Sequence, residues 1–476
     1  MSLKRNIEEV NRDVKRLKVQ PSGALLTFFG TLTESEKGEA VMKSNQEMKF
    51  PFQLTNATLP KCCDIERFRN PPTDSKEEHY QAYFINACSK LPNKRVSVED
   101  THKFPVLLTR KPDCVTIDED HGLDPLNVEM VIEIKPQRKT RFSDQDIGQV
   151  LAFAEKVLQL QSRRHFVFAI LTDCHHIQLF EVARVPNSYE TFTYRYTTRE
   201  FLKYEGTGTP PLGWRWLVTL LSQQSSSLGW IEPELQYDNK TVKLLQFVNV
   251  GQTSIVYKGE YEGQSVAIKI LKHPDKFQKY LHAEIEIMKK LSTLNSASLP
   301  HLVLHDDISL VMTPLCDNIR RLQKGDISHI VLTLQKVHTS GIRHRDLQRQ
   351  NIVRDCTSRV PVLIDWGCGV DGNQTLPFAG GVDCAADYVL ARIDESFVYK
   401  PEYDLISFIR SIYIMLHKPD YFPKLSFGKE DGVTQIAQSV ADFWKYHARS
   451  EFWKEMYDKA QHLDYEGLIH QLEELF

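Results

Sequence analysis

Apolar and polar positions in the first half of the chain follow two different periods, and each period predicts a different element. Between residues 73 and 91 the apolar side chains lie three or four positions apart, as at Tyr80 and Phe84, which predicts an amphipathic helix. Thr73 or Asp74 is the expected cap, because a short side chain bearing oxygen accepts a hydrogen bond from the first helical turn.

A second helix is predicted for residues 143–160 by the same spacing. Residues 104–117 and 128–136 are instead rich in β-branched side chains and predict two strands before this helix. Residues 165–173 and 176–184 predict two more strands after it. The resulting order, helix–strand–strand–helix–strand–strand, is that of a small mixed α/β domain.

The strand expected in "VEMVIEIKP" contains two charges. Glu133 and Lys135 lie two positions apart, so their side chains point to the same face of the strand. Burying a carboxylate and an ammonium is costly unless a partner requires them. A solvated ion pair on a half-exposed strand is the plain alternative.

The chain changes character near its middle. The stretch "SQQSSSLGWIEPEL" is rich in Ser, Gln, Gly and Pro and has no apolar period, which favours a linker. Strand-rich sequence follows it, and then mainly helical sequence. These features predict four segments: an N-terminal extension at 1–70, a first domain at 71–205, a connecting helix and linker at 206–235, and a second domain at 236–476.

Composition narrows the class of protein. A chain of 476 residues with 41% hydrophobic side chains can form two domain cores. A net charge of -3 gives no overall basic footprint for nucleic acid. The 9 cysteines include no C-x-x-C pair, which fits a reducing compartment. No run is long enough for a membrane span, and the N-terminus lacks the apolar core of a signal peptide. We therefore expect no membrane partner.

Two basic clusters lie in the first twenty residues, Lys4-Arg5 and Lys15 to Lys18. They fit either a solvated helix with Glu/Lys pairs or a two-part nuclear import signal.

The second half contains four motifs in a fixed order, "VAIKIL", "HAEIEIMKKL", "HRDLQRQN" and "IDWG". Together they resemble the eukaryotic protein kinase domain, which implies a bilobal α+β fold, ATP and Mg²⁺. The resemblance implies that Lys269 holds ATP phosphates and pairs with Glu284. It also implies that Asp346 accepts the proton of the substrate hydroxyl, and that Asn351 and Asp365 hold magnesium.

The glycine-rich loop departs from the kinase pattern. Asn249, Gly251 and Ser254 stand at its three glycine positions, so the approach of ATP phosphates to the backbone is expected to be looser. Gly251 and Ser254 remain the expected cofactor contacts of this loop. Trp366 replaces the usual Phe, and Asp387 is the candidate for the Glu that normally ends the activation segment.

The first domain resembles the PD-(D/E)xK nuclease core, the fold of restriction endonucleases, in "KPDCVTI" and "VIEIKP". The resemblance implies that Asp113, Glu133 and the Ile134 carbonyl hold Mg²⁺ or Mn²⁺. It implies that Lys135 orients the attacking water or stabilises developing charge at a DNA phosphodiester.

Two further residues complete this expected site. Glu77 lies on the helix before the strands and is preferred to Glu78, because it falls on the line of Tyr80 and Phe84. Gln149 matches the family's glutamine on the helix after the lysine strand and is expected to help orient the site. The cluster Asp173 to His176 is expected to be a polar turn rather than a metal site.

The combination of the two domains resembles the C-terminal part of Crinkler-type effectors. The resemblance implies a toxin-like protein acting in the nucleus, with a DNA endonuclease domain and a kinase domain that supports or regulates it by phosphorylating a protein substrate or itself. The alternative is a signalling Ser/Thr kinase whose first domain only binds nucleic acid or a partner. The sequence leaves the oligomeric state open.

Overall fold

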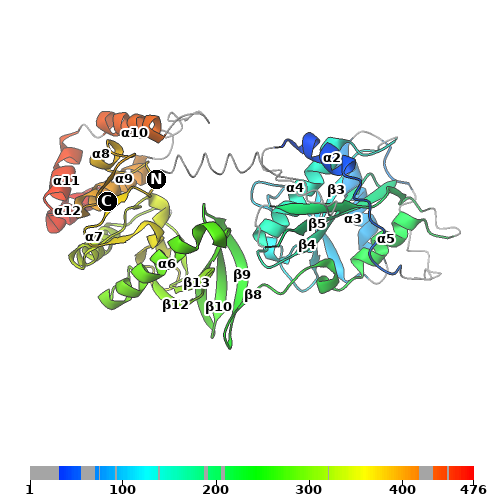
Figure 1. The fold of residues 1–476 in the computed structure, drawn as a ribbon, viewed down its shortest axis with the longest axis horizontal. Coiled ribbons are helices and arrows are strands. Elements are labelled where there is room, and N and C mark those ends of the chain that lie inside the picture. Colours follow the sequence, from blue (N-terminus) through cyan, green and yellow to red (C-terminus); the bar gives the residue numbers. More distant parts are fainter. Residues whose placement is uncertain are drawn as a thin grey trace. The chain divides into compact units, whose positions relative to one another are not determined.

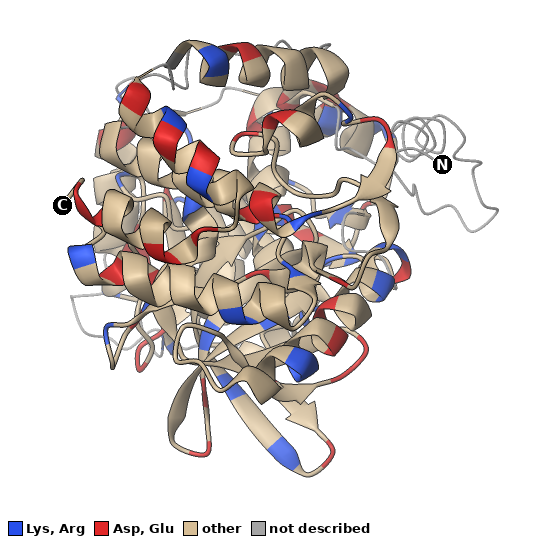
Figure 2. Ribbon diagram, turned by 90° about the vertical axis from the view of Figure 1, so that its left-hand side faces the viewer, with Lys and Arg blue, Asp and Glu red and all other residues tan. Residues whose placement is uncertain are grey.

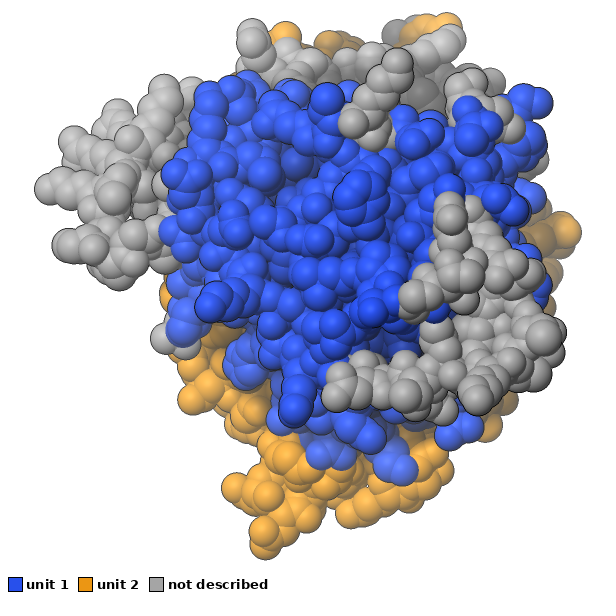
Figure 3. All heavy atoms as spheres, turned by 90° about the vertical axis from the view of Figure 1, so that its right-hand side faces the viewer, with its two compact units in different colours: residues 1–235, 243–248 blue, residues 236–242, 249–476 orange. Residues whose placement is uncertain are grey.

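The computed structural model describes residues 32–54, 70–73, 76–91, 94–137, 140–186, 191–204, 209–319, 321–417, 433–447 and 450–476. The chain divides into two compact units, residues 1–235 with 243–248 and residues 236–242 with 249–476 (Figures 1 and 3). Among the described residues, no helix is long and apolar enough to cross a lipid bilayer. The basic clusters at the N-terminus and Asp74 lie outside the described residues.

The first unit is a seven-stranded sheet with helices on it. Its strands are β1 (Val96–Asp100), β2 (Cys114–Asp118), β3 (Met130–Ile134), β4 (Phe166–Thr172), β5 (His176–Arg184), β6 (Phe192–Tyr196) and β7 (Glu200–Phe201). They pair in chain order from β1 to β6, and β7 pairs with β5. Only β3 and β4 run parallel, because α4 (Asp144–Leu160) provides the crossover between them.

Helices pack against this sheet by their apolar stripes. Helices α3 (Glu77–Ser89) and α5 (Leu212–Leu221) share one buried core with alternate residues of the strands, among them Met130, Ile132 and Ile134. By alternation Val131 and Glu133 point to the other face. Helix α4 begins with a capping box at Ser143, and α2 (Glu34–Lys43) packs on α4.

The first unit differs from the expectations in three places. Residues 104–113 are a loop rather than part of a strand, because Pro105 and Pro112 cannot donate to a ladder. Strand β1 was not predicted from its short, polar sequence. Residues 32–54 of the expected extension belong to this unit, since Phe50 stacks on Trp216 with ring centroids 5.0 Å apart.

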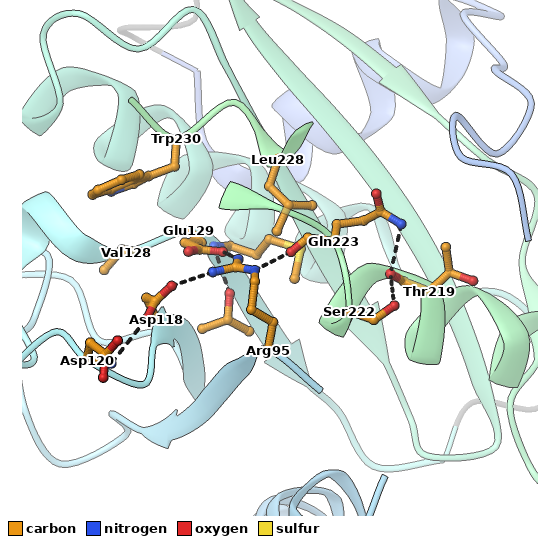
Figure 4. Close-up of polar contacts among 12 residues, drawn as sticks. Arg95, Asp118, Asp120, Val128, Glu129, Thr219, Ser222, Gln223, Leu228 and Trp230 are labelled. Atoms are coloured by element: carbon orange, nitrogen blue, oxygen red, sulfur yellow. Dashed lines mark hydrogen bonds and ion pairs between the residues drawn. The ribbon is translucent and has the colours of Figure 1, made fainter. Parts of the chain in front are cut away.

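The connecting helix and linker expected at 206–235 are also part of the first unit where they are described. Trp214 is fully buried in its core, and the indole of Trp230 donates to the carbonyl of Leu126 at 2.9 Å. The Arg95 guanidinium lies between Asp118, Glu129 and the backbone carbonyl of Gln223, and it donates to all three (Figure 4). The buried tryptophans and the contact with Arg95 fix this segment in the first unit, although its polar composition is typical of a linker.

The second unit has two lobes. The first lobe is a six-stranded sheet, ordered β12-β13-β11-β10-β9-β8, with one helix on it. Its elements are β8 (Glu234–Tyr237), β9 (Lys240–Val250), β10 (Ser254–Tyr261), β11 (Gln264–Leu271), α6 (Pro274–Leu291), β12 (His301–His305) and β13 (Ser309–Thr313).

The second lobe is mainly helical and has the largest core cluster of this unit. Its helices are α7 (Lys324–Thr339), α8 (Asp387–Leu390), α9 (Pro401–His417), α10 (Val433–His447), α11 (Glu451–Gln461) and α12 (Tyr465–Glu473). Its short strands are β14 (Cys316–Asn318), β15 (Ile342–Arg343), β16 (Ile352–Asp355), β17 (Pro361–Leu363), β18 (Val370–Asp371), β19 (Thr375–Pro377) and β20 (Ser396–Val398). Figure 2 shows basic and acidic residues interspersed over the helices, as expected for a nearly neutral chain.

Candidate functional site

A buried lysine joins two carboxylates in the second unit. Lys269 lies on β11, and its ammonium donates to Glu284 of α6 at 2.7 and 3.0 Å and to Asp365 at 2.8 Å. Burial lowers the pKa of Lys269, but the charges of Asp365 and Glu284 outweigh it and raise the pKa overall. The charge of Lys269 lowers the pKa of Asp365. The trio therefore keeps an ammonium and a carboxylate charged beside each other.

The loop between β15 and β16 contains a third carboxylate, that of Asp346. Asp346 accepts from the Asn351 amide at 2.9 Å, and the same amide donates to the Asp346 backbone carbonyl at 2.8 Å. Burial raises the pKa of Asp346. Both amide hydrogens of Asn351 point to Asp346. The side-chain oxygen of Asn351 is therefore available to accept a hydrogen bond from another group or to bind a metal ion.

Asp404 of α9 holds this loop in place through the loop's backbone N–H groups. Fully buried, it accepts from the backbone N–H of His344 at 2.8 Å and of Arg345 at 2.9 Å. Arg345 has φ +68, a left-handed conformation that non-glycine residues adopt only when their surroundings fix it. Asp404 supplies that restraint one residue before Asp346.

The expected phosphate loop is the turn between β9 and β10. Gly251 is exposed, and its N–H donates to the Ser254 carbonyl at 2.8 Å. Ser254 is buried and begins β10. Cofactor contact by either residue stays a prediction.

Several contacts of the second unit were not predicted. Asp346 also accepts from the N–H of Gly381 at 2.6 Å and from Gln348 at 3.0 Å, so the segment after Asp365 packs on the Asp346 loop. Asp387 accepts from buried Arg410 at 2.8 Å. The sequence indicated only Asp387 of the Asp387–Arg410 pair, through its position at the end of the segment after Asp365.

The first unit brings four of its predicted residues together. In the β2–β3 register Cys114 pairs with Ile132, so Asp113 and Glu133 come next to each other one step further out. Glu77 is the first residue of α3, and ligand oxygens of Glu77, Asp113 and Glu133 lie within 4.8 Å of one another. The Lys135 ammonium donates to Glu133 at 2.5 Å and to Glu77 at 2.9 Å.

Burial controls the charges in this cluster. Burial, opposed in part by the hydrogen bond from the Ile134 N–H at 2.7 Å, raises the pKa of Asp113 to about 6. Burial, and then the charge of Asp113, raise the pKa of Glu133 to about 8. Burial lowers the pKa of Lys135, but Glu133 outweighs it, and the pKa is raised overall. Three carboxyl groups around one ammonium favour a further cation.

Some of the other residues expected near this cluster contact it and others do not. Glu78 is exposed while Glu77 is half-buried, as the helical line implied. Gln149 is half-buried on α4 and forms no hydrogen bond with the other four residues. Gln81 was missed, although it lies one turn after Glu77 on α3 and donates to Asp113. Metal ligation by the Ile134 carbonyl stays a prediction.

The cluster of Asp173 to His176 is a polar turn, as predicted. The Asp173 carboxylate accepts from the N–H groups of His175 at 3.0 Å and His176 at 2.7 Å, which is a side-chain-closed turn. Arg138 and Lys139, the basic residues after Lys135, lie outside the described residues.

A bilobal fold with a Lys269–Glu284 pair and a braced Asp346 loop defines the protein kinase class. Residues 243–471 match the family model described as Protein kinase domain, so the second unit is a protein kinase domain. The solved "Structure of vaccinia related kinase 3" is 15% identical, with 51% of this chain and 90% of that chain covered and a TM-score of 0.38. No curated protein matches the chain.

Residues 77–164 match a domain of unknown function, DUF6826. The match begins at Glu77 and includes Asp113, Glu133, Lys135 and Gln149. The comparisons give this domain no activity.

Proposed function

We propose that the second unit transfers the γ-phosphoryl group of ATP to a protein hydroxyl. The observation that supports this most directly is the joint placement of Lys269, Glu284 and Asp365 in a protein kinase domain. Lys269 would hold ATP phosphates, and Asn351 and Asp365 would hold Mg²⁺, which neutralises charge on the transferring group. Asp346 would accept the hydroxyl proton.

Phosphate transfer to the protein itself and to a generic basic substrate tests this proposal. Asp346→Asn keeps the shape of the loop but removes the base, so we expect at least a 100-fold slower transfer (about 10²–10⁴ for general base catalysis). Asp307→Asn is the matched control, because Asp307 is an exposed carboxylate of the same unit. Equal activity of wild type and Asp346→Asn would contradict the assignment.

We further propose that the first unit is a divalent-metal-dependent DNA endonuclease. The supporting observation is that Oε2 of Glu133 is buried and has no hydrogen-bond partner among the described residues. Glu133 also belongs to a group of three carboxylates with Glu77 and Asp113, which fits Mg²⁺ or Mn²⁺ because these ions prefer hard oxygen ligands. The element order, helix α3, strands β1 to β3, helix α4 and strand β4, also agrees with the PD-(D/E)xK resemblance.

The residues of this cluster would have different roles in the reaction. Glu77, Asp113 and Glu133 would hold the cation, which supplies an activated water and neutralises charge at phosphorus. Lys135 would orient that water or stabilise the charge on the phosphate oxygens. Gln81 and the Ile134 N–H hold the Asp113 carboxylate in place.

Plasmid nicking with Mg²⁺ tests the nuclease proposal. Glu133→Gln should lower the rate by about 100-fold or more, because even outer-shell changes at metal sites cost about 10–100-fold. Glu119→Gln, at an exposed carboxylate of the same unit, should cut like wild type. A wild type that cuts no faster than Glu133→Gln under these conditions would refute the proposal.

We also propose a nuclear, Crinkler-like effector role with DNA as the partner of the first unit. It rests on the pairing of the two domains and on the basic N-terminal clusters. The alternative is a signalling kinase whose first domain only binds a partner, and it fits the family matches at least as well. Nicking by wild type but not by Glu133→Gln would favour the effector with a nuclease domain, and no nicking by wild type would favour the signalling kinase.

A further inference from the structure

A loop between β1 and β2 begins and ends beside Asp113. We call residues 101–112 the Phe104 loop. Its two ends are joined, because the Thr101 N–H donates to the Asp113 carbonyl at 3.0 Å and the Thr101 hydroxyl donates to the Pro112 carbonyl at 2.6 Å. The base of the loop is therefore fixed beside Asp113.

The loop has a fixed shape. Val106 and Leu107 are buried and anchor it to the unit. The N–H of Phe104 donates to Thr101 and the N–H of Val106 donates to Phe104, at 3.0 and 2.8 Å. These bonds close tight turns on both sides of Phe104.

Phe104 itself points into solvent. Its side chain is 60% exposed, and no described aromatic ring contacts it. Because its turn is anchored, the exposed phenyl ring can stack on a ligand without further ordering of the backbone.

Two lysines of the same loop stand on either side of Phe104 in the sequence. Lys103 and Lys111 are exposed, and neither has an ion-pair partner among the described residues. Arg110 lies next to Lys111 and pairs with Glu34 at 2.7 Å. A single ring between free lysines is a poor match for an apolar protein surface, but it matches a base and its flanking phosphates.

We propose that the Phe104 loop is the DNA-contacting element of the first unit, an inference that rests on the proposed nuclease function. Phe104 stacks on or inserts beside a base. Lys103 and Lys111 bind phosphates on either side and set the register of the strand. Because Lys111 is two residues from Asp113, the bound strand passes the carboxylate cluster.

Binding is measured first, with the full chain carrying Glu133→Gln and fluorescein-labelled duplex and single-stranded DNA without divalent metal. Added Phe104→Ala should weaken binding by about tenfold, within the range for loss of one stacked base. Added Lys103→Ala/Lys111→Ala should reduce the slope of log K against log salt by about 1.8, or about 0.9 for each phosphate contact. Tyr446→Ala, an equally exposed aromatic residue of the second unit, should change neither.

Cleavage by the same loop variants with Glu133 intact separates the two proposals. If wild type nicks plasmid and both loop variants bind and nick like wild type, the loop inference is overturned and the nuclease stands. If wild type binds DNA through the loop but no form nicks, the loop inference stands and the nuclease falls. If wild type neither binds nor nicks, both fall. Thermal unfolding of Phe104→Ala should stay close to that of wild type, because most of the residue is exposed.

Discussion

At the scale of single residues, the charges of the carboxylate cluster in the first unit depend on burial. The carboxyl of Glu133 has its pKa raised from 4.5 to about 8 by burial and by Asp113. The folded chain therefore keeps a proton that the unfolded chain releases. This contribution to stability is complete below about pH 4.5 and is lost as the pH rises through about 8. Asp113 acts in the same direction, with a folded-state pKa of about 6.

A cation should reverse this loss, because it binds the charged carboxylates. We expect Mg²⁺ to raise the melting temperature more at about pH 8 than at about pH 6. Glu133→Gln should be at least as stable as wild type at pH 8 without metal, because its amide has no charge to bury, and it should lose most of the Mg²⁺ response. Thermal unfolding at the two pH values measures this. An Mg²⁺ response that is equal at both, or unchanged in Glu133→Gln, would contradict it.

The cluster around Glu133 also shows which site residues can be predicted from the sequence and which cannot. Glu133, Lys135 and Asp113 were found from a short motif, and Glu77 from its place on a helical line. Gln81 is one turn further on that line, but an amide that holds a carboxylate has no motif of its own. The contact of Gly381 with Asp346 joins segments 35 residues apart, a distance over which periodicity carries no information.

At the scale of elements, α2 and α4 make an unusually close contact. A Cβ on Gly38 would lie 1.8 Å from the Asp144 carbonyl oxygen, and one on Gly148 would lie 1.6 Å from that of Glu34. Beside them Lys37 pairs with Glu155 at 2.6 Å. The first turns of α4 are therefore held by a helix that the sequence left unassigned.

Gly148→Ala should force the two helices apart. We expect a loss of about 1–3 kcal/mol in the free energy of unfolding, as for other overpacked sites, measured by chemical denaturation. Gly122→Ala is the control, because a Cβ there meets nothing within 4 Å. A Gly148→Ala protein as stable as wild type would show that α2 does not hold α4.

The C-terminal helix α12 is linked to the catalytic loop through a buried chain of hydrogen bonds. Tyr465 and His338 Nδ1 are 2.8 Å apart, and His338 Nε2 lies 3.1 Å from the Asp404 carboxylate. A carboxylate only accepts, so Nε2 bears a proton and donates to it. His338 Nδ1 then lies within hydrogen-bond distance of the Tyr465 hydroxyl, and we predict that Tyr465 positions the Asp346 loop through His338 and Asp404.

Tyr465→Phe should lower kcat for phosphate transfer by about fivefold, the effect of about 1 kcal/mol for one buried hydrogen bond. The KM for ATP should stay the same, because Lys269 and Asp365 are not part of this chain of bonds. Tyr446→Phe, at an exposed tyrosine, is the control. A change in KM with kcat preserved would show that Tyr465 does not act through the Asp346 loop.

At the scale of the whole molecule, two domains were predicted from the break in composition, but their boundary was not. The segment 206–235 was predicted to be a connecting helix followed by a linker, the linker because of its serines and glutamines; the helix is present as α5. Its tryptophans and leucines decide its place, because burial of Trp214 and Leu228 in the first core outweighs the polar residues between them. The kinase lobes were predicted because four motifs fix their order, whereas β1 and α2 have no such motif.

The two units have separate buried cores, so each should respond to its own ligand. Calorimetry of the full chain should show two unfolding transitions. ATP with Mg²⁺ at about 100 times its dissociation constant should stabilise the kinase transition by about 2.7 kcal/mol, and Lys269→Met should remove this shift. Mg²⁺ alone should shift the other transition, and Glu133→Gln should remove that shift without altering the effect of ATP. A single transition that moves with either ligand would show instead that the two cores unfold together and that the sites are energetically coupled.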